Sequence, residues 1–129
     1  MACVPLCLEM ANSSLETVNG SIVFINKNSR LMYDLKYRIR VVCMEDFEQI
    51  VNVDEYIGFL YGIISQDHDI ELIFIDSILK HADIKFADIE DFLGRVDQIS
   101  RTFGMDFIVS LSATREELGP YLDKYERLN

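Results

Sequence analysis

Residues 71–76 are Glu71-Leu72-Ile73-Phe74-Ile75-Asp76, an apolar run that ends in a carboxylate. The run is continuous rather than alternating, which is typical of a strand that is covered on both faces of a sheet. Three similar runs occupy residues 21–25, 40–44 and 106–111, and a helical pattern follows each of the four. Strands that alternate with helices predict a parallel sheet with helices on both of its faces.

The predicted fold is therefore a three-layer α/β sandwich, with a mostly parallel central sheet of at least four strands flanked by helices. The chain has 129 residues, of which 50% are hydrophobic, enough for one continuous core and too many for a disordered polypeptide. We expect a single α/β domain over residues 20–129, and a leader or short packing segment over residues 1–19.

Four helix starts and one short turn can be predicted from the residues that begin them. Asn28 or Ser29 is expected to cap a helix after the first strand, and Pro120 is expected to start the last helix. Asp46 is expected to open a short turn, and Asp54 to begin a helix that ends near residue 65 and is covered nearly all round. Gly58 and Gly62 on that helix suggest close approach to the sheet or to a neighbouring subunit.

The clearest helical pattern begins after Asp88, with Asp91 completing a capping box. Gly104 is expected to end this helix in a left-handed conformation. The face expected to point inward consists of Ile89, Phe92, Leu93, Val96, Ile99 and Phe103.

Charge and cysteine content limit the classes of function. The formal net charge of −10 repels phosphate backbones and anionic lipids, which argues against nucleic-acid or membrane-surface binding. Cys3, Cys7 and Cys43 are odd in number and give no disulfide framework, so a reducing cytoplasm is the expected location. No apolar run approaches the roughly 18 residues of a membrane span.

The candidate site follows from the parallel sheet, because the carboxyl ends of parallel strands lie along one edge. Asn26, Lys27, Asn28 and Ser29 follow the first strand, and Glu45 and Asp46 follow the second. Asp76 and Ser77 follow the third, and Ser112 and Thr114 follow the fourth. Oxygen ligands at one edge could hold a hard cation such as Mg²⁺. Such residues are also ordinary helix caps and loop starters.

Asp76 is the most informative single residue, because a carboxylate next to a buried strand needs solvent, a cation or a hydrogen-bond donor. It is a candidate Mg²⁺ ligand, phosphate acceptor or loop cap. The candidate nucleotide- or phosphate-binding residues are Lys27, Asn28, Asp76, Ser77 and Ser112.

Residues 72–78, Leu-Ile-Phe-Ile-Asp-Ser-Ile, resemble the Walker B strand of RecA-like P-loop ATPases, particularly the branch related to the circadian-clock ATPase. In that family a later strand ends in a polar residue that senses the γ-phosphate, a role that the resemblance assigns to Ser110 or Ser112. The phosphate loop of that family, G-x-x-x-x-G-K-[ST], does not occur anywhere in residues 1–129. The resemblance therefore implies a degenerate site or the distal piece of a longer protein.

Asp76 and Ser112-Ala113 also resemble the phosphoacceptor and the Ser/Thr-Ala positions of response-regulator receiver domains. The acidic pair of that family is replaced by Asn26-Lys27, and no fifth strand with a terminal lysine follows. This second resemblance therefore implies a pseudo-receiver rather than an active one.

The primary hypothesis is a non-catalytic α/β protein that acts through protein contacts, as a homo-oligomer or within a larger assembly, with no cofactor. The alternative is a phosphate- or nucleotide-responsive switch centred on Asp76, with Mg²⁺ as its cation. A third option is a metal-dependent hydrolase that uses Glu45, Asp46 and Asp76, which requires the three carboxylates to lie within about 8 Å of one another.

Overall fold

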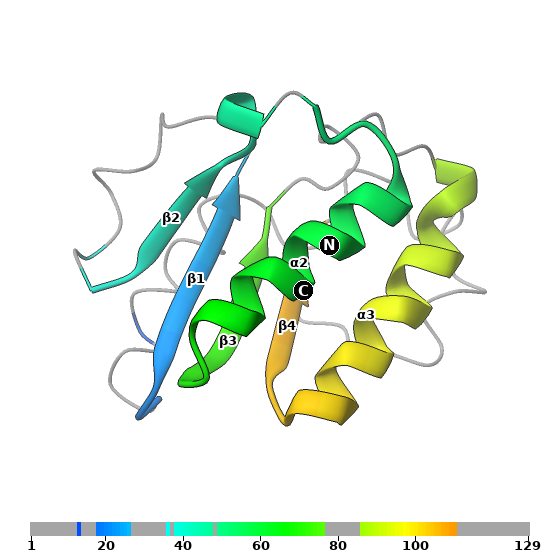
Figure 1. Ribbon diagram of the computed structural model, residues 1–129. Coiled ribbons are helices and arrows are strands. Elements are labelled where there is room, and N and C mark those ends of the chain that lie inside the picture. The colour runs from blue at the N-terminus through cyan, green and yellow to red at the C-terminus, as the bar shows by residue number, and fades with distance from the viewer. Residues whose placement is uncertain are drawn as a thin grey trace.

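A four-stranded parallel sheet with two helices against one face forms the described part of the molecule (Figure 1). The computed structural model describes residues 13, 18–26, 36, 38–47, 49–76 and 86–110. The α/β class predicted from the sequence is confirmed. The helix expected after the first strand, the helix expected from Pro120 and nearly all of residues 1–19 lie outside these residues.

The strands are β1 (Ser21–Asn26), β2 (Arg40–Cys43), β3 (Ile70–Ile75) and β4 (Asp106–Val109). Their order across the sheet is β2-β1-β3-β4, and every neighbouring pair is parallel. All four predicted strands are confirmed, with bounds that differ from those expected by one or two residues. The parallel arrangement that the predicted site requires is therefore present.

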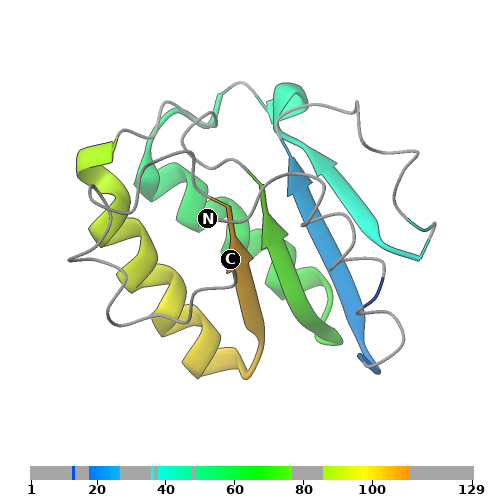
Figure 2. The ribbon, with the colours of Figure 1, turned by 180° about the vertical axis from the view of Figure 1, so that it is seen from behind.

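Both faces of the sheet are buried, as the continuous apolar runs predicted. Val23, Ile25, Ile73 and Ile75 pack on the side of the helices. The alternate residues of β1 and β3 form a second cluster on the opposite face, where the rings of Phe24 and Phe74 stack with centroids 5.6 Å apart. Figure 2 shows this opposite face in front of the helices.

Helix α2 (Val53–Gln66) connects β2 to β3 and begins at Asn52, whose side chain accepts a hydrogen bond from the backbone N–H of Glu55 at 2.9 Å. The helix was expected to start at Asp54 and starts one residue earlier, at Val53, because the side chain of Asn52 supplies the cap. Asp54 instead lies in the first turn, where it forms an ion pair with Arg95.

Helix α2 is buried on one side only. Its inward residues are Val53, Tyr56, Ile57, Leu60, Ile63 and Ile64. Gly58 and Gly62 are exposed, and a Cβ atom at either would meet no other atom within 4 Å. The expectation of a helix covered nearly all round was therefore wrong. Of the two contacts expected at these glycines, close approach to the sheet was wrong, and close approach to a neighbouring subunit stays a prediction.

Helix α3 (Ile89–Phe103) connects β3 to β4 and packs beside α2. Five of the six expected inward residues are buried, but Phe103 is 47% exposed because it occupies the last helical turn. Asp88 precedes the helix as expected, yet it belongs to a 3-10 turn (Phe86–Asp88) and its side chain makes no capping hydrogen bond. Gly104 has φ 66°, which confirms the predicted left-handed end.

Candidate functional site

The carboxyl ends of the four strands finish in one row of residues across the sheet. Asn26 pairs with Cys43 of β2. The backbone N–H of Asp76 donates a hydrogen bond to the carbonyl oxygen of Ile25 at 2.9 Å. The backbone N–H of Ser110 donates a hydrogen bond to the carbonyl oxygen of Ile75, also at 2.9 Å. The ladder thus continues for one residue beyond β3 and β4, and the terminal row is Cys43, Asn26, Asp76 and Ser110.

Three members of this row are polar and buried. Asn26 is 7% exposed, Asp76 is 1% exposed and Ser110 is 4% exposed, and they are the only buried polar residues in the described part of the chain. Burying a polar side chain costs free energy unless it has bonding partners, and each of the three residues makes an interaction beyond those given above. Their concentration on adjacent strand ends makes the row a candidate site.

The pleat of the strands sets the direction of these side chains. Successive side chains of a strand point to opposite faces, and Ile25 and Ile75 face the helices. Asn26 and Asp76 therefore follow the direction of Phe24 and Phe74, toward the face of the sheet opposite α2 and α3.

The row includes the position where the chain reverses its direction of travel across the sheet. From β1 the chain moves outward to β2, then returns past β1 to β3 and continues to β4. In open parallel sheets, ligands bind outside the carboxyl ends of the two strands that flank such a reversal. Here those strands are β1 and β3. Strand β1 ends at Asn26, and Asp76 directly follows the end of β3.

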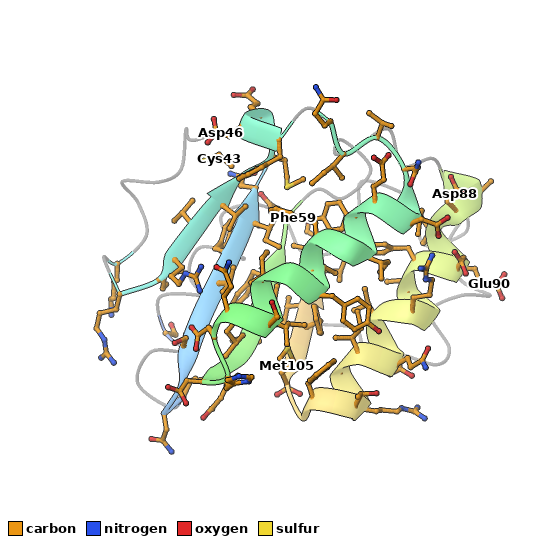
Figure 3. All side chains as sticks on the ribbon, in the orientation of Figure 1. Cys43, Asp46, Phe59, Asp88, Glu90 and Met105 are labelled. Carbon is orange, nitrogen blue, oxygen red and sulfur yellow. The ribbon has the colours of Figure 1, made fainter. Side chains whose placement is uncertain are left out.

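Cys43 contributes a protonated thiol to this edge. Burial raises its pKa, and the nearby carboxylates of Asp46 and, to a smaller extent, Glu45 raise it further. Cys43 and Asp46 lie at the carboxyl end of β2 in Figure 3. Because the thiolate is the reactive form of cysteine, this environment does not suit a nucleophile. Asp46 itself lies within a 3-10 helix (Met44–Phe47), so the prediction that it opens the turn was wrong.

Of the five candidate nucleotide- or phosphate-binding residues predicted from the sequence, the structure describes only Asp76. Lys27, Asn28, Ser77 and Ser112 lie outside the described residues, so their convergence with Asp76 stays a prediction. Asn26 and Ser110 were expected near the strand ends, and the structure places both in the terminal row. Their signal in the sequence was a polar residue directly after an apolar run.

Among residues 18–26, 38–47, 49–76 and 86–110, no group of three or more His, Cys, Asp or Glu side chains could hold a metal ion. Glu45, Asp46 and Asp76 all fall in these ranges, so the three-carboxylate hydrolase has no geometric support. Any cation beside Asp76 would need neutral oxygen ligands as well, of which Asn26 and Ser110 are the nearest in the row.

Comparison of the chain with protein-family models and with curated proteins found no match, so the family resemblances stay predictions. In the described residues, no helix has both the length and the apolar character that a membrane crossing requires.

Proposed function

We propose that this chain is a phosphate- or nucleotide-responsive switch centred on Asp76, without catalytic turnover. The observation that carries the proposal is the position of Asn26, Asp76 and Ser110. The buried polar residues of the described chain gather where the strand order reverses, which is where parallel sheets bind their ligands.

The ligand is expected to arrive with Mg²⁺. The terminal row has one carboxylate and no basic side chain, and the chain carries a net charge of −10, so a bare phosphate would be repelled. Mg²⁺ is commonly held by one or two carboxylates together with phosphate oxygens and water. In this proposal Asp76 binds or orients the hydrated cation, and Asn26 and Ser110 provide neutral polar contacts.

The two family resemblances assign compatible roles. As a degenerate RecA-like core, the chain would use Asp76 in the Walker B position and Ser110 or Ser112 as the γ-phosphate sensor. As a pseudo-receiver, it would use Asp76 as a phosphate acceptor. We do not propose that the chain hydrolyses a nucleotide, because residues 1–129 include no glycine-rich phosphate loop.

Isothermal titration of the full chain with ATP, ADP and GTP in excess Mg²⁺ tests the proposal. The wild type is expected to bind at least one nucleotide, and Asp76→Asn is expected to weaken that binding at least tenfold. Asp106→Asn is the matched control, because Asp106 is exposed at the opposite end of β4. Circular dichroism establishes that both variants are folded.

Two results would overturn the proposal. One is no binding by the wild type at millimolar nucleotide together with no phosphoryl adduct after incubation with acetyl phosphate, measured by intact mass. The other is equal binding by the wild type and a folded Asp76→Asn variant.

A second candidate function is action through protein contacts, without a small ligand. It is supported by four large apolar side chains that are exposed in the described chain, namely Phe47, Val51, Tyr61 and Phe103. The oligomeric state of the full chain tests this candidate, because self-association is the simplest contact that would cover such side chains.

A further inference from the structure

An asparagine followed by a glycine lies in the bend that leads into β1. Asn19 and Gly20 form this bend directly before Ser21, the first residue of the strand, and Asn19 is exposed. Among the residues that the structure describes, no hydrogen bond or ion pair involves the Asn19 side chain. The side-chain amide of Asn19 is therefore open to water and free to turn toward the backbone that follows it.

The backbone nitrogen of Gly20 is the group that can react with this amide. Glycine has no Cβ atom, so nothing on the residue itself hinders the approach to its nitrogen. The backbone hydrogen bond from this segment to the residue before β3 is donated by Ser21, to the carbonyl oxygen of Asp69. Gly20 donates none of the backbone hydrogen bonds between described residues. A change at its nitrogen therefore breaks no bond of the ladder directly.

The other asparagines in the described part of the chain lack this combination. Asn26 is only 7% exposed. Asn52 is exposed, but its side chain accepts the capping hydrogen bond from the backbone N–H of Glu55 at 2.9 Å. Asn52 also precedes Val53, whose branched side chain crowds its own backbone nitrogen. Asn52 is therefore an internal reference with the same side chain and a protected geometry.

The reaction that this geometry allows consumes only water. The nitrogen of Gly20 loses its proton to solvent and forms a bond to Cγ of Asn19, and the side-chain nitrogen of Asn19 takes up a proton and leaves as ammonia. Water then adds to one of the two carbonyl carbons of the cyclic imide and breaks the bond from that carbon to the Gly20 nitrogen, which regains a proton. Attack at the backbone carbonyl carbon gives isoaspartate, and attack at Cγ gives aspartate.

The products disturb the contact between this bend and β3. The space beside Gly20 is filled, because a Cβ atom there would lie 2.0 Å from the backbone oxygen of Asp69. Isoaspartate inserts a methylene group into the backbone just before Gly20, so the chain has to shift where there is no room. Both products also add a carboxylate near Asp69 and Glu71, and like charges repel each other.

We propose that Asn19 and Gly20 form a site of spontaneous modification, at which Asn19 becomes isoaspartate or aspartate and the pairing of β1 with β3 is weakened. The proposal goes beyond the ligand-responsive switch and does not depend on it, because Asp76 lies at the opposite end of the β1–β3 ladder. Nucleotide titration and chemical ageing of the chain therefore report on the two proposals separately.

Ageing of the full chain at physiological temperature and mildly alkaline pH tests the proposal. Peptide mass spectrometry measures the conversion at each asparagine, and labelling by an isoaspartate methyltransferase distinguishes isoaspartate from aspartate. Asn19 is expected to convert at least tenfold faster than Asn52. The Tm of the aged chain, measured by circular dichroism, is expected to fall in proportion to the converted fraction.

Asn19→Gln is the matched control, because it keeps an exposed amide at this position but cannot form the same ring. It is expected to fold like the wild type and to keep its Tm during ageing. A synthetic peptide of residues 15–24 provides the rate of the reaction without the fold. Conversion of the peptide without conversion of Asn19 in the folded chain would contradict the proposal. So would conversion at Asn19 that is no faster than at Asn52, or complete conversion with an unchanged Tm.

Discussion

Replacing Gly20 with alanine tests the close approach of β1 and β3 at their first residues. A Cβ atom on Gly20 would lie 2.0 Å from the backbone oxygen of Asp69 and 2.8 Å from Cγ of Glu71. The same carbonyl of Asp69 accepts a hydrogen bond from the backbone N–H of Ser21 at 2.7 Å. The oxygen therefore cannot move away without disturbing the start of the β1–β3 ladder.

The expected cost follows from this geometry. The two atoms must separate by at least 1.0 Å, since 3.0 Å is the closest approach that real Cβ atoms tolerate. Loss of the hydrogen bond between Ser21 and Asp69 costs about 1 kcal/mol. Forcing a methyl group into an occupied space adds about 1–3 kcal/mol. Gly20→Ala is therefore expected to lower the free energy of unfolding by about 2–4 kcal/mol, or roughly 8–16 °C in Tm at about 4 °C per kcal/mol.

Thermal and urea unfolding, followed by circular dichroism, measure this effect. Gly94→Ala is a control with the same chemical change in open space, and it is expected to raise stability by up to about 1 kcal/mol. Equal stability changes in the two variants would refute the argument, because they would show that the start of β1 has room for a side chain.

Three further predictions concern single residues. The N–H of Asp69 donates to Asp67 at 2.9 Å, and this hydrogen bond is the main reason that the pKa of Asp67 is lowered; Arg40 adds to the effect. A carboxyl group whose pKa is lowered in the folded state stabilises the fold at pH values above its ordinary pKa, and this stabilisation is lost as the pH falls through the lowered pKa. Asp67→Asn is therefore expected to reduce Tm at neutral pH and to have little effect on Tm in strong acid. Because Cys43 is buried and its pKa is raised, iodoacetamide is expected to alkylate Cys43 slowly in the native protein and fast in urea. Peptide mass spectrometry measures the two rates, and equal rates would contradict the prediction. Gly104→Ala is expected to cost about 1 kcal/mol in urea unfolding, because φ is 66° there; an unchanged midpoint would show that the turn relaxes.

The elements of the sheet were predictable because burial on both faces leaves a local signal. The run from Leu72 to Ile75 is apolar at every position, and both faces of β3 are indeed covered. Its length and its β-branched residues were enough to predict a strand. The left-handed end of α3 at Gly104 was predictable for the same reason, since it depends on a single residue.

Features that depend on distant contacts were not predictable from local patterns. The space beside Gly20 is occupied by Asp69, just before β3, and by Glu71 of β3, and no local spacing around Gly20 indicates this. Phe103 continues the apolar stripe of α3, yet it is the last residue of the helix and is exposed. At the candidate site, Asp76 was identified from its own run, whereas the row that joins it to Asn26 and Ser110 requires the strand order.

The strand order also has a kinetic consequence. β1 lies at the centre of the sheet, but its inner neighbour β3 is made only after residues 27–69 have been added. Pairings between distant segments carry a high loop-closure entropy and slow the search for the native state. During synthesis on the ribosome, the edge of the apolar β1 strand that pairs with β3 therefore stays unpaired until β3 has been made. Non-local parallel pairing of this kind leaves a chain exposed to aggregation until the partner strand arrives.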